Sequence, residues 1–249
     1  MLIIFDGNSI AHRLYHGLKV EETQSFGTMV SKFYGIVENC QRAYQSDHAA
    51  IVWDSDNDTW RHRTYPDYKK GRKPATETLK TGVDRIKKAT RIDQCEIPGW
   101  EADDIINTMV SSYDGECLIY SSDKDFFQLV SSRVSILSQA SGVVRKIDER
   151  EVFRMFGLMP VQLADFKSLV GDKSDNIKGV PGIGEVVATQ LLTDYLRLDT
   201  IYENLESIRP AIAKKLEAGK ESAYFSKRLV GLTSAPVEMP WLSSPVLQM

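Results

Sequence analysis

Acidic side chains recur in this 249-residue sequence at the ends of apolar runs and in short motifs. Asp6 follows the apolar residues 2–5, and Asp54 follows the apolar residues 49–53. Carboxylates are the ligands that hard divalent cations such as Mg²⁺ prefer. The two strand-end aspartates and the acids of three later motifs give nine candidate metal ligands: Asp6, Asp54, Glu101, Asp103, Asp104, Asp123, Asp125, Asp172 and Asp175.

Each acidic motif has an ordinary alternative explanation. A lone Asp is usually a helix cap or a turn residue, and residues 101–104 could simply begin a helix after Pro98-Gly99. Several motifs that all stand at strand ends or helix starts are harder to explain as separate caps. Gathered carboxylates repel each other unless metal neutralises them. We therefore predict two divalent ions about 4 Å apart, an arrangement that hydrolyses phosphodiesters.

The apolar runs predict how the acids come together. Residues 2–5, 49–53 and 117–120 are typical of buried parallel strands. Helical patterns over residues 26–44 and 102–112 separate them, so the sequence predicts an α/β fold with a twisted, mostly parallel sheet flanked by helices. Because carboxyl ends of parallel strands meet at one edge, the strand-end aspartates should converge there.

The later half of the sequence predicts a helical region. We expect a hairpin over residues 134–147, turning at Ser141-Gly142, and a boundary near Ile147. Residues 1–147 would form the α/β core, including a basic segment at about residues 58–98. Residues 148–249 would form helices without strands, starting with residues 149–156 and 161–170, and would still supply Asp172 and Asp175 to the site.

The basic segment stands out against a formal net charge of -3. From Arg61 to Arg91 there are eleven Lys or Arg and three acids, a local charge of +8. Such a run can be a solvated helix face. The interleaved aromatic residues Trp60, Tyr65 and Tyr68 favour contact with phosphates and bases instead.

Glycines at positions 179, 182 and 184 precede a helical pattern through Leu191 and Leu192. Backbone amides there can approach a phosphate closely. Set between helices, the loop is typical of a helix-hairpin-helix that grips duplex backbone, although a tight interhelical turn is the alternative. The carbonyl groups of Val180, Gly182 and Ile183 could also hold a monovalent cation such as K⁺.

Other features exclude some classes of protein. The first apolar run is too short for a signal peptide or a membrane span, so we expect a cytoplasmic protein. Three widely spaced cysteines fit neither a disulfide framework nor a zinc site. No histidine is needed as a nucleophile, and His12, His16, His48 and His62 are interpreted as structural or solvent-facing.

Taken together, the motifs resemble the 5′-nuclease, or flap endonuclease, superfamily, and most closely the 5′-nuclease domain of bacterial DNA polymerase I. The resemblance covers nearly the whole chain. It is carried by FDGNSIAHR at 5–13, VWD at 52–54, WRH at 60–62, YKKGR at 68–72, EADD at 101–104, SDKD at 122–125, GDKSDN at 171–176 and GIG at 182–184.

The resemblance implies a PIN-like core, a helical arch and a role for each candidate residue. Asp6, Glu101, Asp103 and Asp104 would belong mainly to one Mg²⁺ site, with Mn²⁺ as a substitute. Asp123, Asp125, Asp172 and Asp175 would belong to the second, and Asp54 would assist through water. Lys69 and Arg72, with Tyr68, would act on the scissile phosphate. Other DNA contacts would come from Arg13, Arg61, Lys70, Lys73, Gly182 and Gly184.

The implied substrate is DNA with 5′ flaps, 5′ overhangs or nicks. No polymerase domain follows, so the resemblance implies a free-standing, monomeric enzyme, as in phages and the exonuclease IX group. The tail ending at residues 245–249 shows no sliding-clamp motif. Two alternatives stay open: a DNA-binding scaffold with weak turnover, and a PIN-type ribonuclease.

Overall fold

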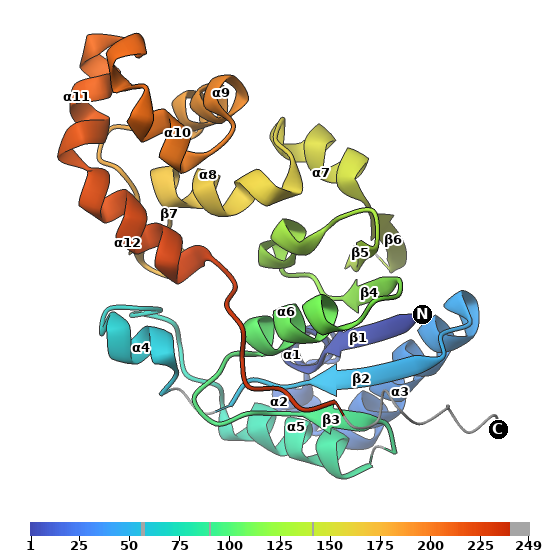
Figure 1. Ribbon diagram of the computed structural model, residues 1–249. Helices are drawn as coiled ribbons and strands as arrows, with labels where there is room; N and C mark the ends of the chain where they lie inside the picture. Colours follow the sequence, from blue (N-terminus) through green and yellow to red (C-terminus); the bar gives the residue numbers. More distant parts are fainter. Residues whose placement is uncertain (56–57, 90, 141, 240–249) are drawn as a thin grey trace.

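The computed structural model describes residues 1–55, 58–89, 91–140 and 142–239 (Figure 1). Ser141 of the predicted turn and the tail at residues 245–249 lie outside these ranges. Figure 1 shows a sheet packed between helices, with a helical region next to it.

A six-stranded sheet forms the centre of the molecule. Its strand order is β3-β2-β1-β4-β5-β6, and only the β5–β6 pair is antiparallel. The sequence did not predict β3, a short and polar edge strand. The strands are β1 (Leu2–Asp6), β2 (His48–Val52), β3 (Asp93–Cys95), β4 (Cys117–Tyr120), β5 (Val134–Ala140) and β6 (Val143–Ile147).

Both faces of the sheet are covered because its central strands are apolar on both sides. On β1, Ile3 and Phe5 face one hydrophobic cluster, whereas Leu2 and Ile4 face another. The first face carries α1 (Gly7–Gly17), α2 (Val20–Thr23), α3 (Phe26–Tyr44) and α5 (Glu77–Ala89), and the second carries α6 (Ala102–Ser112). The predicted α/β sandwich is confirmed, including the bounds of α3 and α6.

The basic segment folds partly onto the core. It forms α4 (Trp60–Thr64), a turn and α5, and α5 buries Leu79, Gly82 and Ile86. Gly82 lies directly beside Met29 of α3, and a larger residue at this position would have to displace the Met29 side chain. α5 therefore packs against the helices that cover one face of the sheet, and its basic side chains lie outside the buried stripe of the helix.

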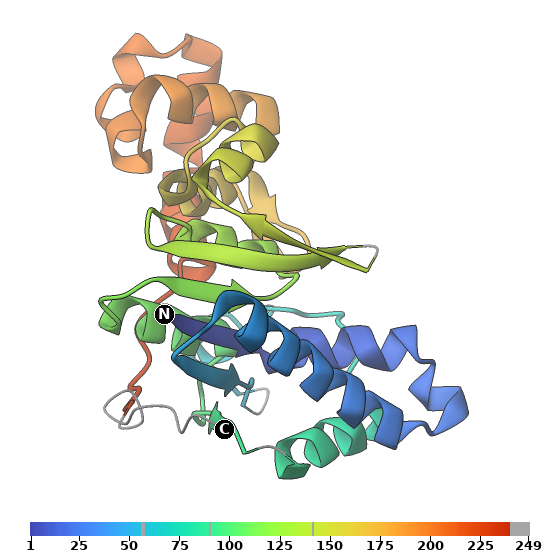
Figure 2. The same cartoon turned by 90° about the vertical axis from the view of Figure 1, so that its right-hand side faces the viewer.

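The helical region follows the β5–β6 hairpin and rises above the sheet edge (Figure 2). The prediction that it lacks strands is wrong, because β7 (Gly171–Asp172) and β8 (Ile177–Lys178) form a small antiparallel pair. Two residues per strand are too few to leave a sequence pattern. Its helices are α7 (Glu149–Phe156), α8 (Leu163–Val170), α9 (Glu185–Tyr195), α10 (Leu198–Glu203), α11 (Pro210–Ala218) and α12 (Lys220–Val230).

Among the described residues, no helix has both the length and the apolar character needed to cross a bilayer.

Candidate metal centre

A cavity of about 700 Å³ opens where the carboxyl ends of β1, β2 and β4 face the helical region. Seven of the nine candidate carboxylates line it: Asp6, Asp54, Asp103, Asp123, Asp125, Asp172 and Asp175. The ends of β1, β2 and β4 bring Asp6, Asp54 and Asp123 there, and the first turn of α6 brings Asp103. The short 3-10 helix after β4 supplies Asp125, and β7 and the loop after it supply Asp172 and Asp175. The convergence expected from the strand ends is therefore present in the structure.

Four of these carboxylates have no ion pair with any described residue: Asp6, Asp54, Asp103 and Asp123. Their hydrogen bonds are with neutral donors. Asp6 accepts from the Ser121 hydroxyl at 2.7 Å and the Ser9 amide at 3.0 Å, and Asp54 accepts from the Ala102 amide at 2.8 Å. These bonds fix the side chains without neutralising their charge.

The pKa values show that burial and mutual repulsion disfavour the charged form of these carboxylates. Burial raises the pKa of Asp6 to about 7. Burial, followed by the negative charges of Asp123 and Asp54, raises the pKa of Asp103 well above its usual range. A divalent cation would remove this repulsion, so the donor set fits a hard metal ion.

The described acidic side chains do not surround any one position closely enough to bind a metal ion without water. No three acidic, histidine or cysteine residues among them are arranged as direct ligands of one ion. Mg²⁺ keeps several of its waters in proteins and is often held by only one or two carboxylates directly. An ion bound partly through water therefore agrees with the spacing of these residues.

The other carboxylates at the cavity are paired with cations. Lys167 of α8 donates to Asp125 and, at 2.7 Å, to Asp172, and Arg72 donates to Asp175 at 2.5 Å. Burial alone would raise the pKa of Asp172, but hydrogen bonds from Lys167 and Ser174 lower it to about 2. Three of the seven carboxylates at the cavity are thus paired with two cations, and the other four have no such partner among the described residues.

The sequence did not identify Lys167 as a partner of the candidate metal ligands. A single lysine on a predicted helix is ordinarily a surface residue, and its only signal was its position five residues before Asp172. The aromatic wall of the cavity, formed by Phe156 and Phe166, gave no signal either. His12, which we expected to be structural or solvent-facing, also lines the cavity.

The structure contradicts the predicted roles of Asp104 and Arg61. Asp104 is fully buried away from the cavity, and Arg61 donates to its two carboxylate oxygens at 2.7 and 2.9 Å. Arg61 is itself only 2% exposed, which excludes direct contact with DNA in this conformation. Consecutive helical residues point about 100° apart, and on α6 Asp103 faces the cavity while Asp104 points away from it.

Glu101 lies behind the cavity wall. Its carboxylate accepts from Arg61 at 2.7 Å, from Tyr68 at 3.1 Å and from Lys69. Burial would raise the pKa of Glu101, but the positive charges of Lys69 and Arg61 lower it overall. Lys69 links this buried group to the cavity that its own side chain lines.

Lys69 and Arg72 both line the cavity, as their predicted role requires, whereas Tyr68 is buried behind them. The Lys69 amide donates to the Asp175 carbonyl at 2.9 Å, and the Tyr68 hydroxyl, whose single proton is shared between Glu101 and Asp175, lies 3.0 Å from the Asp175 carboxylate. The turn after α4 is therefore tied to the loop between β7 and β8.

The remaining predicted DNA contacts lie outside the cavity. Arg13 is partly buried, and its guanidinium donates to the Tyr120 hydroxyl at 3.0 Å. Lys70 and Lys73 are exposed. In the glycine loop, Gly182 has a φ of 80°, and Lys215 donates to its carbonyl at 3.1 Å. An ammonium group therefore already contacts one of the three carbonyls predicted to hold K⁺.

The raised carboxylate pKa values predict how metal-free protein responds to pH. Between about pH 4 and pH 7 the folded state holds a proton on Asp6 that the unfolded state has released, so stability falls as pH rises. We expect the melting temperature in chelator to drop by on the order of 10 °C across this window. Calorimetry would check this. Mn²⁺ should restore stability and Asp6→Asn should flatten the profile, whereas a melting temperature that rises with pH would contradict it.

Family models match both parts of the chain. The model described as "5'-3' exonuclease, N-terminal resolvase-like domain" matches residues 1–157, and the one described as "5'-3' exonuclease, C-terminal SAM fold" matches residues 158–245.

Individual relatives cover the chain almost fully. It is 36% identical over 245 residues to the flap endonuclease Xni of Shewanella pealeana, covering 96% of this chain and 94% of the relative. It is 35% identical over 241 residues to DNA polymerase I of Caldicellulosiruptor bescii, covering 92% of this chain but only 28% of that polymerase. The bacteriophage T5 flap endonuclease, solved with DNA and metal ions, shares the fold with a TM-score of 0.75 at 23% identity, covering 93% and 89% of the two chains. Two matched models and a relative of nearly equal length lead to one conclusion: the chain belongs to the 5′-3′ exonuclease family.

Proposed function

We propose that this protein is a structure-selective 5′ nuclease that cuts DNA near junctions of single and double strands with two divalent metal ions. Membership of the 5′-3′ exonuclease family makes it a nuclease. The observation that carries the finer proposal is the division of charge across the cavity. Four carboxylates without an ion pair line the same cavity as the cations Lys69, Arg72 and Lys167.

This combination of carboxylates and cations suits the binding of metal ions together with a phosphodiester. Asp6, Asp54, Asp103 and Asp123 would hold one ion, and Asp125, Asp172 and Asp175 would hold the other. When bound, such ions activate water and stabilise the leaving oxygen. Lys69 and Arg72 would bind the scissile phosphate and stabilise its growing charge. Phe156 and Phe166, which also line the cavity, would limit the access of water to it.

The relatives support DNA as the substrate. One is named a flap endonuclease, and the phage T5 enzyme was solved with DNA and metal ions. The glycine loop before α9 would hold the duplex backbone through its amides. A monovalent cation at the carbonyls of Val180, Gly182 and Ile183 remains part of the proposal, with Lys215 as its competitor.

One cleavage assay tests the proposal. Labelled 5′-flap DNA, single-stranded RNA of the same sequence and blunt duplex are incubated with Mg²⁺ or Mn²⁺, and again with chelator. We expect metal-dependent cleavage of the flap. Tight flap binding without cleavage would favour a scaffold, preferred RNA cleavage would favour a PIN-type ribonuclease, and cleavage in chelator would exclude the metal mechanism.

Lys167 provides a separate prediction about metal affinity. Its ammonium already binds Asp125 and Asp172, so an ion must displace it there. Lys167→Ala should tighten Mn²⁺ binding about tenfold, which corresponds to roughly 1.4 kcal/mol and is modest for a close charge pair. Titration followed by electron paramagnetic resonance, without DNA, would measure it. Lys124→Ala is the matched control because Lys124 lines the same cavity and forms no ion pair with a described residue. Equal affinity in both variants would show that Lys167 does not compete.

A further inference from the structure

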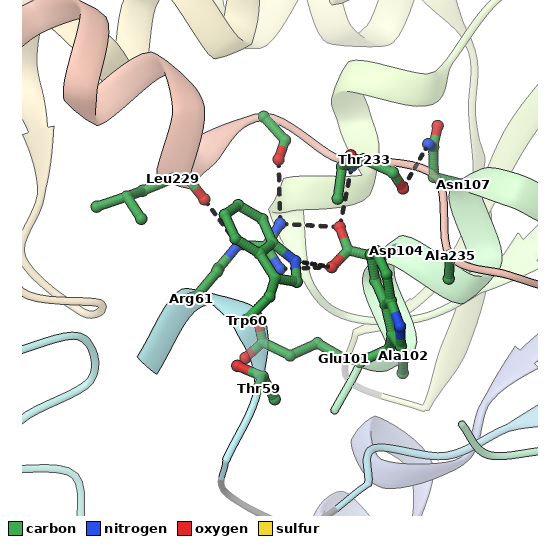
Figure 3. Close-up of polar contacts among 12 residues, drawn as sticks. Thr59, Trp60, Arg61, Glu101, Ala102, Asp104, Asn107, Leu229, Thr233 and Ala235 are labelled. Carbon is green, nitrogen blue, oxygen red and sulfur yellow. Dashed lines mark hydrogen bonds and ion pairs between the residues drawn. The ribbon is translucent and has the colours of Figure 1, made fainter. Parts of the chain in front are cut away.

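The chain after α12 crosses back over α6 and is fastened to it. We call residues 229–235, the last turn of α12 and the segment after it, the strap. The Thr233 amide donates to Asp104 at 3.0 Å, and the Thr233 carbonyl accepts from the Asn107 side chain at 3.0 Å (Figure 3). The Ala235 amide donates to the Thr108 hydroxyl at 2.8 Å. The strap thus joins the helical region to the first turns of α6.

Arg61 is the centre of this connection. Its Nε donates to the Leu229 carbonyl at 2.8 Å, and its Nη2 donates to the Gly231 carbonyl at 3.0 Å. Three further bonds, of 2.7 to 2.9 Å, run from Nη1 and Nη2 to Glu101 and Asp104. A guanidinium has five N–H donors, so every one of them is used. No other side chain could replace this set, because lysine offers only three donors from a single atom.

Asp104 completes the arrangement. Besides Arg61 and Thr233, it accepts from the Trp60 indole at 2.8 Å. If Asp104 turned toward the cavity to bind metal, Arg61 would stay buried with two of its donors unpaired, which is costly. The contacts therefore favour Asp104 as the fixed counter-charge of Arg61.

The connection lies directly behind the metal centre. A second cavity of only about 10 Å³ is lined by Arg61 and Leu229 together with Asp103, Asp125 and Asp175. A space this small holds one water at most. Displacement of Arg61 or the strap would therefore affect the groups that lie between them and the metal centre. Glu101, held by both Arg61 and Lys69, would move first.

We propose that Arg61 and Asp104 are positioning residues that lock the strap onto α6 and hold Glu101 behind the metal centre. The proposal rests on the proposed nuclease function, but its main readouts are measured without DNA. Asp104 then acts through Arg61 and not as a metal ligand, in contrast to Asp103, its neighbour on the same helix.

The test compares Asp104→Asn with Asp103→Asn in the full chain. Amide exchange of Thr233 and Ala235, measured by NMR in chelator, reports on the strap, and Mn²⁺ titration reports on the metal centre. We expect Asp104→Asn to speed strap exchange at least about tenfold and to change Mn²⁺ affinity by less than about threefold. Asp103→Asn should do the reverse, with Mn²⁺ affinity reduced by about tenfold or more. Equal losses of Mn²⁺ affinity in the two variants would overturn the proposal.

A double-mutant cycle gives a second, independent criterion. If Asp104 acts through Arg61, the variant Arg61→Gln with Asp104→Asn should exchange its strap amides no faster than the faster single variant. Additive effects would overturn the proposal. Turnover on flap DNA should fall in parallel while KM stays within about threefold, because none of these groups touches DNA. If wild-type protein cuts no DNA, the proposed function fails. The amide-exchange rates would still show whether Arg61 and Asp104 hold the strap on α6.

Loss of a buried charge can unfold a chain, so a milder variant is needed as well. Trp60→Phe removes the indole N–H that donates to Asp104, replaces the ring that lies 4.6 Å from the Arg61 guanidinium by a smaller one, and keeps all charges. Circular dichroism should show a folded protein. The Thr233 amide should exchange several-fold faster than in wild type, and exchange at the wild-type rate would overturn the proposal.

Discussion

Replacing Asp103 by asparagine should lower the turnover number on flap DNA by about three orders of magnitude. Asp103 lines the cavity, has no ion pair among the described residues and lies close to the charges of Asp123 and Asp54. A metal ion contributes several kcal/mol of transition-state stabilisation, and each 1.36 kcal/mol corresponds to a factor of ten in rate. DNA affinity should stay within about threefold because the lost charge faces metal and not phosphate. Single-turnover kinetics and binding in Ca²⁺ would separate the two effects.

Asp114→Asn is the matched control for this prediction. Asp114 follows the same helix at its other end, is exposed and forms no ion pair with a described residue. Its turnover should equal that of wild type. Turnover of Asp103→Asn within tenfold of wild type would remove Asp103 from the metal centre.

The sequence could predict those parts of the site that depend on strand ends. Asp6, Asp54 and Asp123 follow buried strands, and a parallel sheet brings such positions together whatever the details of packing. The hydrophobic periodicity of α3 and α6 was equally informative, because an amphipathic pattern can be recognised in a helix's own sequence without knowing which elements pack against it.

The sequence could not separate Asp103 from Asp104. Both stand in one acidic motif, and only the rotation of α6 against the sheet decides which faces the cavity. Arg61 was misleading for a related reason. It belongs to a basic run that resembles a DNA-binding surface, yet its partners are the carboxylates of Glu101 and Asp104 and two carbonyl groups about 170 residues away. Such long-range contacts leave no local pattern.

Lys69→Ala should lower the turnover number by about 10² to 10³, the usual cost of removing one fixed group that stabilises transition-state charge. The Lys69 side chain lines the cavity, and its backbone has a φ of 53° and is held by the Asp175 carbonyl. A side chain held in place in this way can stabilise charge without having to reorganise. If it also contacts phosphate in the ground state, the slope of log affinity against log salt should fall by about one.

The control for Lys69 removes an equal charge from the same basic segment. Lys88 is exposed on α5 and does not line the cavity, so Lys88→Ala should retain wild-type turnover. A similar loss in both variants would mean that the segment acts through its overall field, as an electrostatic guide for DNA. A loss confined to Lys69 would instead mean that one ammonium, held between Glu101 and the cavity, acts at the reacting phosphate. The difference matters because a long-range field weakens with salt, whereas a group in contact with the phosphate should still be required at high salt.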